Sequence, residues 1–456
     1  MKKMRLMLGG AFAAALALAC GLLLVSCETP SYPSEAAASA VTKKTFTSRA
    51  DVTINDVSST LPSDFMRGFD ASMVYAVEKA GGVYYNENDE AEDIFNILKR
   101  NGVNWIRLRV WNDPDWTDSG SQGWNDLNVT KTLAVRAKAA GMKLLLDFHY
   151  SDTWADPTNQ KMPAAWADLS SADDVADALR DYTYDVLQTL CAAGAAPDMV
   201  QLGNENEVGL FLSGSKNGVS AAFSTTDATD QTKANFAAFI KAGALAVRQA
   251  CPDAKTALHF SRGGDYSKWS GVLTYLLNTS GLDSYIDAVG LSYYTYWNTH
   301  LNVSSLQNAI QSATAVFGKE VFVAETSYGW IGPETADIYW SDDGVSNEFY
   351  TKHEVQACAN IGSALLNDSA NAFETALVEK GDSTYSGQTC LPGSVQNQAS
   401  VTRAIIDATA SVGGSGVFYW GGDWIKAVPG NYENQALFDF DGKVLPSIKV
   451  FSVSSN

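Results

Sequence analysis

Two glutamates stand where short apolar runs turn polar. Glu205 lies in MVQLGNEN (199–206), and Glu325 follows VFVA in EVFVAETSY (320–328). Cleavage of a glycosidic bond needs such a pair, because one carboxyl group protonates the leaving oxygen while the other attacks the sugar or activates water. Asn204, directly before Glu205, can donate to a sugar hydroxyl while the carboxyl reaches the glycosidic oxygen. These residues favour chemistry on a glycosidic bond.

Residues of other types could support the two carboxylates. Arg107 and Arg109 alternate onto one side of NWIRLRVW (104–111), where an inward arginine would keep the nucleophilic carboxylate ionised. At least one of them could instead pair with structural carboxylates. Tyr293 or Tyr294 could hydrogen-bond Glu325, or pack at the rim of the fold. His149 ends KLLLDFHY (143–150), and we favour a positioning role for it over a core role.

A regular alternation of elements must position these side chains. Helical spacing over 90–102, 133–141, 175–194, 234–250 and 401–414 separates short apolar runs, and several of these stretches end at glycine. Eight such units predict a closed parallel (β/α)₈ barrel, although strand count alone leaves a doubly wound open sheet as the alternative. The expected strands span 65–70, 104–111, 143–150, 199–206, 255–262, 286–294, 320–328 and 416–424.

The strand ends predict where the site lies. Most of the runs begin apolar and end polar, and barrel enzymes react at the carboxyl ends of their strands. Glu205 and Glu325 would then converge from the fourth and seventh strands. Trp154 and Trp420 belong to a set of tryptophans in or just after strand ends, and aromatic faces stack well on pyranose rings.

The N-terminus reads as an export signal. Basic residues in MKKMRLMLGG precede an apolar run, so we assign residues 1–26 to a signal peptide. Leu24 to Cys27 resemble a lipobox, which would make Cys27 a lipidated N-terminus; an ordinary signal with an incidental cysteine is the alternative. Residues 27–60 read as a disordered tether, and 61–456 as one catalytic domain. We expect a membrane-anchored lipoprotein, at the outer membrane or cell surface.

Charge and composition exclude several other functions. The net charge is −19, or −22 once Lys2, Lys3 and Arg5 are removed with the signal, which disfavours nucleic acid as a partner. HExxH, GxSxG, Walker A and GxGxxG sequences are missing, so we expect no metal and no cofactor.

An exported chain permits disulfides, but the pairing stays open among four cysteines: Cys191, Cys251, Cys358 and Cys390.

Several stretches closely resemble glycoside hydrolase family 53, the arabinogalactan endo-β-1,4-galactanases. They are RGFDASMV, GVNWIRLRVWNDP, GMKLLLDFHYSDTWADP, PDMVQLGNENEVG, SYYTYW, VFVAETSY and YENQALFDFDGKVLPS. The resemblance implies a retaining enzyme that cuts β-1,4-galactan internally, with Glu205 as acid/base and Glu325 as nucleophile. It also implies that the cleaved sugar is surrounded by Arg109, His149, Asn204, Tyr293 and Trp420, with Asp152 and Trp154 in the cleft.

Three departures from the family pattern bear on details. SYYPYWHG reads SYYTYWNT here, with Thr295 and Asn298, and YWEPAW reads YWGGDW, with Gly421 to Asp423. We expect these positions at the cleft rim. The calcium segment of bacterial relatives is replaced, although Asp342 and Asp343 could still bind calcium. Another retaining hydrolase, such as a xylanase or mannanase, and a non-catalytic glycan-binding lipoprotein are the alternatives. We expect a monomer.

Overall fold

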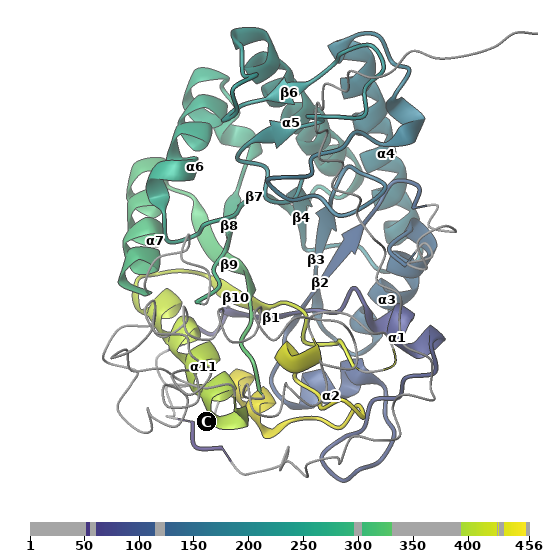
Figure 1. Ribbon diagram of the computed structural model, residues 1–456, viewed down its shortest axis with the longest axis vertical. Helices are drawn as coiled ribbons and strands as arrows, with labels where there is room; N and C mark the ends of the chain where they lie inside the picture. Colours follow the sequence, from purple (N-terminus) through teal and green to yellow (C-terminus); the bar gives the residue numbers. More distant parts are fainter. Residues whose placement is uncertain are drawn as a thin grey trace, which may run out of the picture.

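A closed parallel barrel forms the centre of the molecule (Figure 1). The computed structural model describes residues 52–54, 61–114, 124–295, 303–330, 394–425, 427 and 433–452. Each barrel strand pairs with the next one along the chain, and β1 pairs with both β2 and β10, which closes the ring. The barrel prediction is therefore confirmed over the open sheet. The strands are β1 (Met66–Asp70), β2 (Trp105–Val110), β3 (Lys143–Phe148), β4 (Met199–Leu202), β7 (Lys255–Phe260), β8 (Ala288–Ser292), β9 (Glu320–Thr326) and β10 (Gly416–Tyr419).

All eight strands lie inside the expected runs, but most of them end earlier. Strand β4, for example, stops at Leu202 although the run continues to Asn206. Gly203 has φ +88° and Glu205 has φ +43°, so the backbone leaves the extended conformation directly after the strand. A positive φ is unfavourable for a non-glycine residue, and such strained positions cluster at functional sites.

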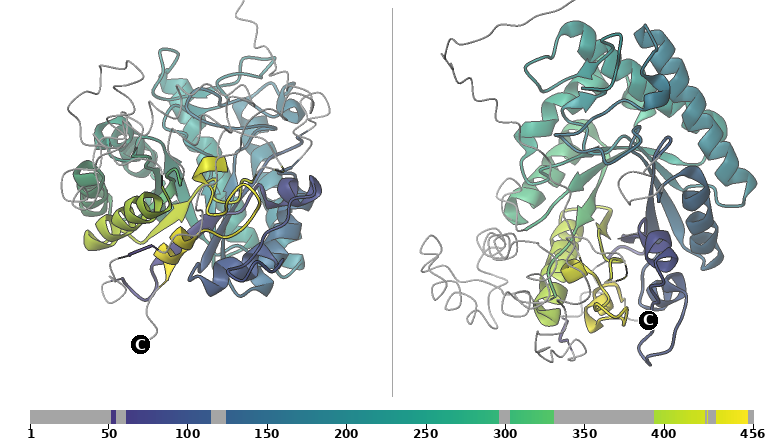
Figure 2. Two further views of the ribbon diagram at one scale, coloured as in Figure 1. Left: turned by 60° about the horizontal axis from the view of Figure 1, so that its bottom comes forward. Right: turned by 45° about the vertical axis from the view of Figure 1, so that its right-hand side comes forward.

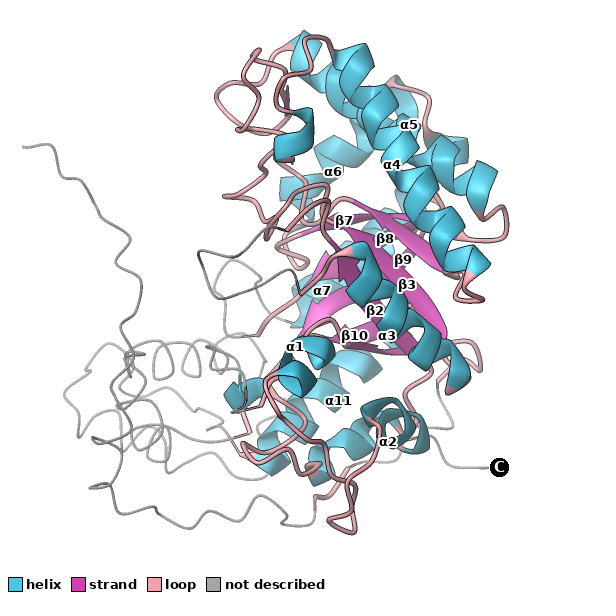
Figure 3. Cartoon of the chain, turned by 90° about the vertical axis from the view of Figure 1, so that its right-hand side faces the viewer, coloured by secondary structure: helices cyan, strands magenta, loops and turns pink. Residues whose placement is uncertain are grey.

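Helices cover the outside of the barrel (Figures 2 and 3). The five predicted helical stretches correspond to α2, α3, α4, α5 and α11. Helix α4 begins where the Ser171 hydroxyl accepts the N–H of Asp174, and Gly194 follows its end with φ +72°. The helices are α1 (Val74–Lys79), α2 (Ile94–Arg100), α3 (Leu127–Ala139), α4 (Ala172–Ala192), α5 (Asp230–Ala250), α6 (Tyr266–Leu273), α7 (Val303–Phe317) and α11 (Val395–Ser411).

Short elements complete the described chain. A π-helical segment, Thr274–Thr279, continues α6, and the two-residue strands β5 (Gly209–Leu210) and β6 (Ala221–Ala222) pair antiparallel. Short 3₁₀ helices occupy Ala164–Trp166, Asp283–Tyr285, Glu433–Gln435 and Pro446–Phe451. Within the described ranges, no helix is both long and apolar enough to cross a membrane.

The interior of the barrel changes from apolar to polar along its axis. One buried cluster takes one or two residues from every strand: Met66, Trp105, Leu145, Met199, Ala257, Ala288, Phe322, Ala324 and Phe418. Because side chains two apart share a strand face, the next inward residues of β2, β3, β4 and β7 are Arg107, Asp147, Gln201 and His259. All four are buried. The apolar layer therefore supports a polar layer nearer the carboxyl ends of the strands.

Candidate active site

Glu325 is held by one cation and one phenol. It lies near the end of β9, and its Oε1 is 2.8 Å from Nη1 of Arg107. Its Oε2 accepts a hydrogen bond of 2.9 Å from the hydroxyl of Tyr294. Both contacts stabilise a carboxylate rather than a carboxylic acid, as a nucleophile requires.

Glu205 occupies a less charged environment. Its Oε1 lies 2.5 Å from the Ser292 hydroxyl, and that hydroxyl lies 2.9 Å from Nε2 of His259. Burial, and then the charge of Arg107, hold the pKa of His259 well below its usual range, so the imidazole is neutral near pH 7. Burial and neighbouring carboxylates are the largest influences on the pKa of Glu205.

The different surroundings of Glu205 and Glu325 shift the pKa values of the two carboxyl groups to different extents. Burial raises the pKa of Glu205 well above its usual range, and the carboxylates of Glu325 and Glu207 raise it further. Burial also raises the pKa of Glu325, but there Arg107 and the Tyr294 hydrogen bond act in the opposite direction. The shared proton therefore belongs on Glu205, which makes Glu205 the acid and Glu325 the ionised partner.

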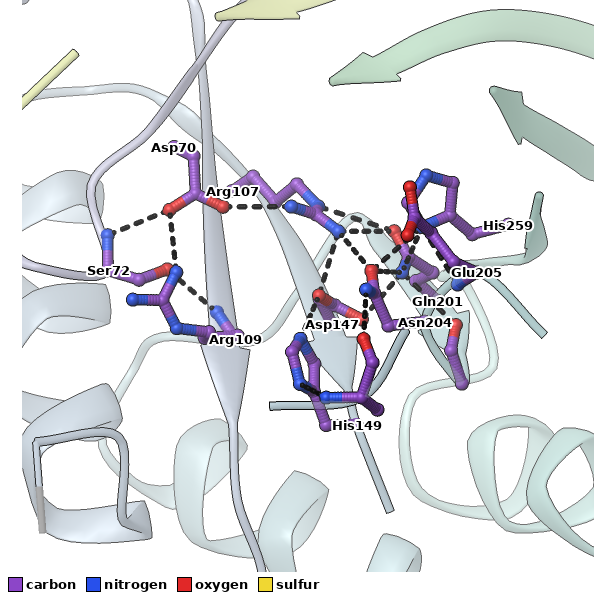
Figure 4. A network of polar contacts seen from close by, with 12 residues as sticks. Asp70, Ser72, Arg107, Arg109, Asp147, His149, Gln201, Asn204, Glu205 and His259 are labelled. Atoms are coloured by element: carbon purple, nitrogen blue, oxygen red, sulfur yellow. Dashed lines mark hydrogen bonds and ion pairs between the residues drawn. The ribbon is translucent and has the colours of Figure 1, made fainter. Parts of the chain in front are cut away.

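Arg107 is the centre of the polar layer (Figure 4). Its guanidinium lies 2.9 Å from Oδ2 of Asp70 and 2.8 Å from Oδ2 of Asp147, in addition to its contact with Glu325. It also donates to Oδ1 of Asn204 at 2.9 Å. One fully buried cation thus fixes both the nucleophile and the asparagine beside the acid.

His149 is oriented by three contacts. Its Nδ1 accepts from the Trp111 indole N–H and from the backbone N–H of Ala155, each at 3.1 Å. Its Nε2 lies 3.2 Å from Asp147 and therefore carries the proton. The carbonyl of Ala155 accepts from Nδ2 of Asn204 at 2.8 Å. These bonds fix which edge of His149 and Asn204 faces the site.

Arg109 forms part of an aromatic cluster rather than contacting Glu325. Its guanidinium carbon lies 4.2 Å from the ring centroid of Trp154, and its nearest carboxylate oxygen belongs to Asp70, at 3.8 Å. Trp154 meets Trp420 edge to face, with centroids 6.3 Å apart. Both indoles are partly exposed, whereas Trp111, Trp330 and Trp424 are buried. Trp154 and Trp420 are therefore the described strand-end tryptophans that can meet a sugar.

Other expected residues occupy different positions. Tyr293 is completely buried in the main hydrophobic cluster, so the tyrosine at Glu325 is its neighbour Tyr294. Asp152 is partly buried and accepts the backbone N–H groups of Asp113 and Ala164, so its carboxylate joins two loops. Thr295 is buried, as are Gly421, Gly422 and Asp423, and this corrects the expectation that they lie at the rim.

The sequence reasoning did not select several residues of the polar layer. Asp70, Asp147, Gln201, His259 and Ser292 are buried polar residues on barrel strands. The signal that could have identified them is their spacing of two or four residues from an apolar inward residue of the same strand. Glu207 was missed as well; it accepts the backbone N–H of Ser261 at 3.0 Å.

Some expectations fall outside the described residues. These are the signal and most of the tether, Cys27, Asn298, the calcium-binding alternative at Asp342 and Asp343, and most of the loop after β9. In the part of the chain that the structure describes, no group of three or more His, Cys, Asp or Glu side chains could hold a metal ion.

Comparison with known proteins places this chain in a family. The model of glycosyl hydrolase family 53 matches residues 66–367 and 369–451. The endo-beta-1,4-galactanase of Bacillus subtilis is 32% identical over 435 residues, which cover 86% of each chain. The arabinogalactan endo-beta-1,4-galactanase of Thermothelomyces thermophilus is 29% identical, over 84% of this chain and 98% of the relative.

Solved structures agree with these sequence matches. The family 53 catalytic domain of Ignisphaera aggregans superposes with a TM-score of 0.67 at 35% identity, covering 88% of this chain and 99% of that one. A chain from a study of two fungal beta-1,4-galactanases gives a TM-score of 0.64 at 28% identity, covering 84% and 98%.

Proposed function

Because the chain belongs to glycosyl hydrolase family 53, we propose that it cleaves β-1,4-galactan internally, with retention at the anomeric carbon. The observation that carries the mechanism is the contrast between the two glutamates. Arg107 and Tyr294 surround Glu325, whereas Glu205 has a neutral serine and lies near other carboxylates. The names of the relatives supply the substrate class.

The reaction follows from the protonation of the pair. Glu205 protonates the glycosidic oxygen while Glu325 attacks the anomeric carbon, so a glycosyl ester forms as the aglycone leaves. Glu205, now ionised, takes a proton from water, and that water displaces Glu325. Two inversions restore the β-configuration. Glu205 and Glu325 supply the proton and the nucleophile, so the proposed reaction uses no metal or cofactor.

The residues around the pair have distinct proposed roles. Asn204 holds a sugar hydroxyl, because its orientation is fixed by buried hydrogen bonds and its Nδ2 has a second hydrogen to donate. His149 positions Asn204 by holding the backbone of Ala155. Trp154 and Trp420 stack on sugar rings, and Arg109 supports Trp154 from behind. Asp152 acts by joining the two loops whose backbone N–H groups it accepts, and Tyr293 acts by packing in the hydrophobic core.

Hydrolysis of a panel of polysaccharides tests this proposal. We expect unbranched β-1,4-galactan to lose viscosity early and to give a ladder of short oligosaccharides, while xylan and β-mannan release few reducing ends. Proton NMR should show the β-anomer first. Glu325→Gln, prepared in parallel, controls for contaminating hydrolases. Faster hydrolysis of xylan or mannan than of galactan, or an initial α-product, would contradict the proposal.

We further propose that the protein is exported and anchored to a membrane by lipid on Cys27, as a monomer at the outer membrane or cell surface. The sequence from Leu24 to Cys27 and the polar stretch up to residue 60 support this. Cys27→Ala should move the enzyme from the membrane fraction to the soluble fraction with unchanged activity per molecule. Retention in the membrane fraction would rule out this anchor.

A further inference from the structure

Two cysteines far from the catalytic pair lie side by side. Cys191 is in the last turn of α4, and Cys251 caps the C-terminus of α5. Their sulfur atoms are 2.8 Å apart, and among the described residues both cysteines are free thiols. The two helices lie next to each other on the outside of the barrel (Figures 1 and 3). The close contact of the two sulfurs therefore lies between the C-terminal ends of two neighbouring helices.

The backbone around both thiols is already ordered. The N–H of Cys251 donates to the carbonyl of Val247, which continues the hydrogen bonding of α5 by one residue. Cys251 is buried, with 6% of its surface exposed, while Cys191 is half-buried. A disulfide needs a sulfur separation of about 2.05 Å. The two sulfurs therefore need to approach by only about 0.75 Å to reach bonding distance.

We propose that Cys191 and Cys251 form a disulfide bond in the mature protein. Each thiol loses a proton and an electron as the S–S bond forms. The two electrons pass to an oxidising disulfide, either glutathione disulfide or that of a host thiol oxidoreductase, which leaves as two thiols. The proposed export would bring the chain into a compartment that supplies such an oxidant.

The exposure of the two thiols sets the order of the exchange. Burial and the neighbouring sulfur raise the pKa of Cys251 to about 12, so its thiolate is scarce near neutral pH. Cys191 is the more accessible of the two. Cys191 therefore attacks the oxidant first, and Cys251 then displaces the carrier from the mixed disulfide.

The bond would stabilise the fold without entering the catalytic site. Cys191 precedes the start of β4 at Met199, and Cys251 precedes the start of β7 at Lys255. Glu205 follows the opposite, carboxyl end of β4. The cysteines are 60 residues apart in sequence, so the cross-link restricts a long segment of the unfolded chain. We therefore expect an effect on stability and none on turnover.

Peptide mapping of the full chain tests the pairing directly. The purified protein is equilibrated with reduced and oxidised glutathione, its free thiols are blocked with N-ethylmaleimide under denaturing conditions, and it is digested without reductant. We expect one linked peptide pair containing Cys191 and Cys251, two hydrogens lighter than the separate peptides. Labelling of both thiols with N-ethylmaleimide, or a bond from either cysteine to Cys358 or Cys390, would overturn the proposal.

Thermal unfolding supplies a second measurement. Cys358→Ser/Cys390→Ser leaves this pair as the remaining cysteines of the catalytic domain, and Cys191→Ser/Cys251→Ser removes it. Dithiothreitol should lower the Tm of the first variant by about 5 °C and leave that of the second unchanged. Galactan hydrolysis should be equal with and without reductant, so a loss of the disulfide is distinguishable from a failure of the proposed activity. If the oxidised and reduced forms of the first variant had equal Tm values, this result would contradict the proposed disulfide.

Discussion

The hydroxyl of Ser292 lies 2.5 Å from Oε1 of Glu205. The same hydroxyl is 2.9 Å from Nε2 of His259, so one proton serves two possible acceptors. When Glu205 is ionised, we expect the hydroxyl to donate to the carboxylate; when Glu205 is protonated, its O–H can donate to the serine oxygen while the serine hydroxyl donates to Nε2 of the neutral imidazole. Because a hydroxyl rotates freely, this bond can follow the two protonation states that Glu205 passes through in one turnover.

Ser292→Ala should therefore shift the pH dependence of catalysis. The Ser292 hydrogen bond lowers the pKa of Glu205, because it favours the carboxylate. Its loss should raise that pKa, and the basic limb of kcat/KM, which follows the protonated acid, should move to higher pH by up to about one unit. Ser267→Ala, at an exposed serine, is the control. A basic limb that stays in place or moves down would contradict this role.

The two glutamates should be distinguishable with azide. On an aryl β-galactobioside, whose leaving group needs little protonation, Glu205→Ala should accumulate the glycosyl enzyme, and azide should release a β-glycosyl azide. Glu325→Ala should lose at least about 10⁴-fold in kcat, and azide should give the α-product by a single displacement. NMR of the azide products checks the assignment. The opposite pattern of anomers would exchange the two roles.

Arg107→Met should affect both stability and pH dependence. Three buried carboxylates, Asp70, Asp147 and Glu325, would lose their shared cation, so the free energy of unfolding should fall by roughly 3–5 kcal/mol. Because Arg107 lowers the pKa of Glu325, the acidic limb of activity should move to higher pH in any folded variant.

Urea denaturation measures the stability effect of Arg107, and Arg100→Met is the matched control. Arg100 forms exposed ion pairs with Glu87 and Glu92, so its loss should change the free energy of unfolding by less than about 1 kcal/mol. Similar effects of the two substitutions would show that Arg107 is not the centre of the polar layer. Arg107→Lys, which keeps the charge but not the fork of donors, should fall between them.

Asp423→Asn should stabilise the protein, and more so at higher pH. Burial, and then the charge of Asp70, raise the pKa of Asp423 to about 7, above the value near 3.9 of an unfolded chain. The folded state therefore binds more protons between pH 4 and 7, and wild-type stability falls as pH rises through that range. Asparagine avoids this loss, and its oxygen can still accept the Met73 N–H.

The free energy of unfolding, compared at pH 4 and pH 8, checks the Asp423 prediction. We expect the variant to gain little at pH 4 and roughly 2–4 kcal/mol at pH 8. Asp253→Asn, at an exposed aspartate, should show no such dependence on pH. A gain that is equal at both pH values would mean that the ionisation of Asp423 does not cause it.

The sequence predicts the strands that carry the site better than it predicts the contacts between the side chains of the site. Apolar runs followed by polar residues were enough to predict eight barrel strands and to select Glu205 and Glu325. Alternation also places Arg107 and Arg109 on one face, but it does not give their height along the barrel axis. Arg109 pairs in register with Asp147 of β3, while Arg107 pairs with Leu145, one step deeper. The depth of a side chain along the barrel axis depends on the stagger between neighbouring strands. The sequence therefore left open which arginine contacts Glu325.

Local backbone conformation explains other differences. Tyr293 and Tyr294 directly follow β8, and adjacent residues point in opposite directions, so one side chain enters the core while the other reaches Glu325. The direction depends on the bulge between Leu291 and Ser292, where the register of β8 with β9 shifts. Asp423 was expected at the cleft rim, near the end of the run 416–424, yet its carboxylate turns inward to the N–H of Met73.

The apolar layer across the base of the barrel has a consequence for the fate of the intermediate. It blocks water from entering at the amino ends of the strands. The leaving sugar, the incoming water and any other acceptor therefore all use the end of the barrel at the carboxyl ends of the strands. A carbohydrate hydroxyl that remains there after bond cleavage competes directly with water for the glycosyl enzyme. At high galactan concentration the same geometry would therefore synthesise longer chains as well as shorten them.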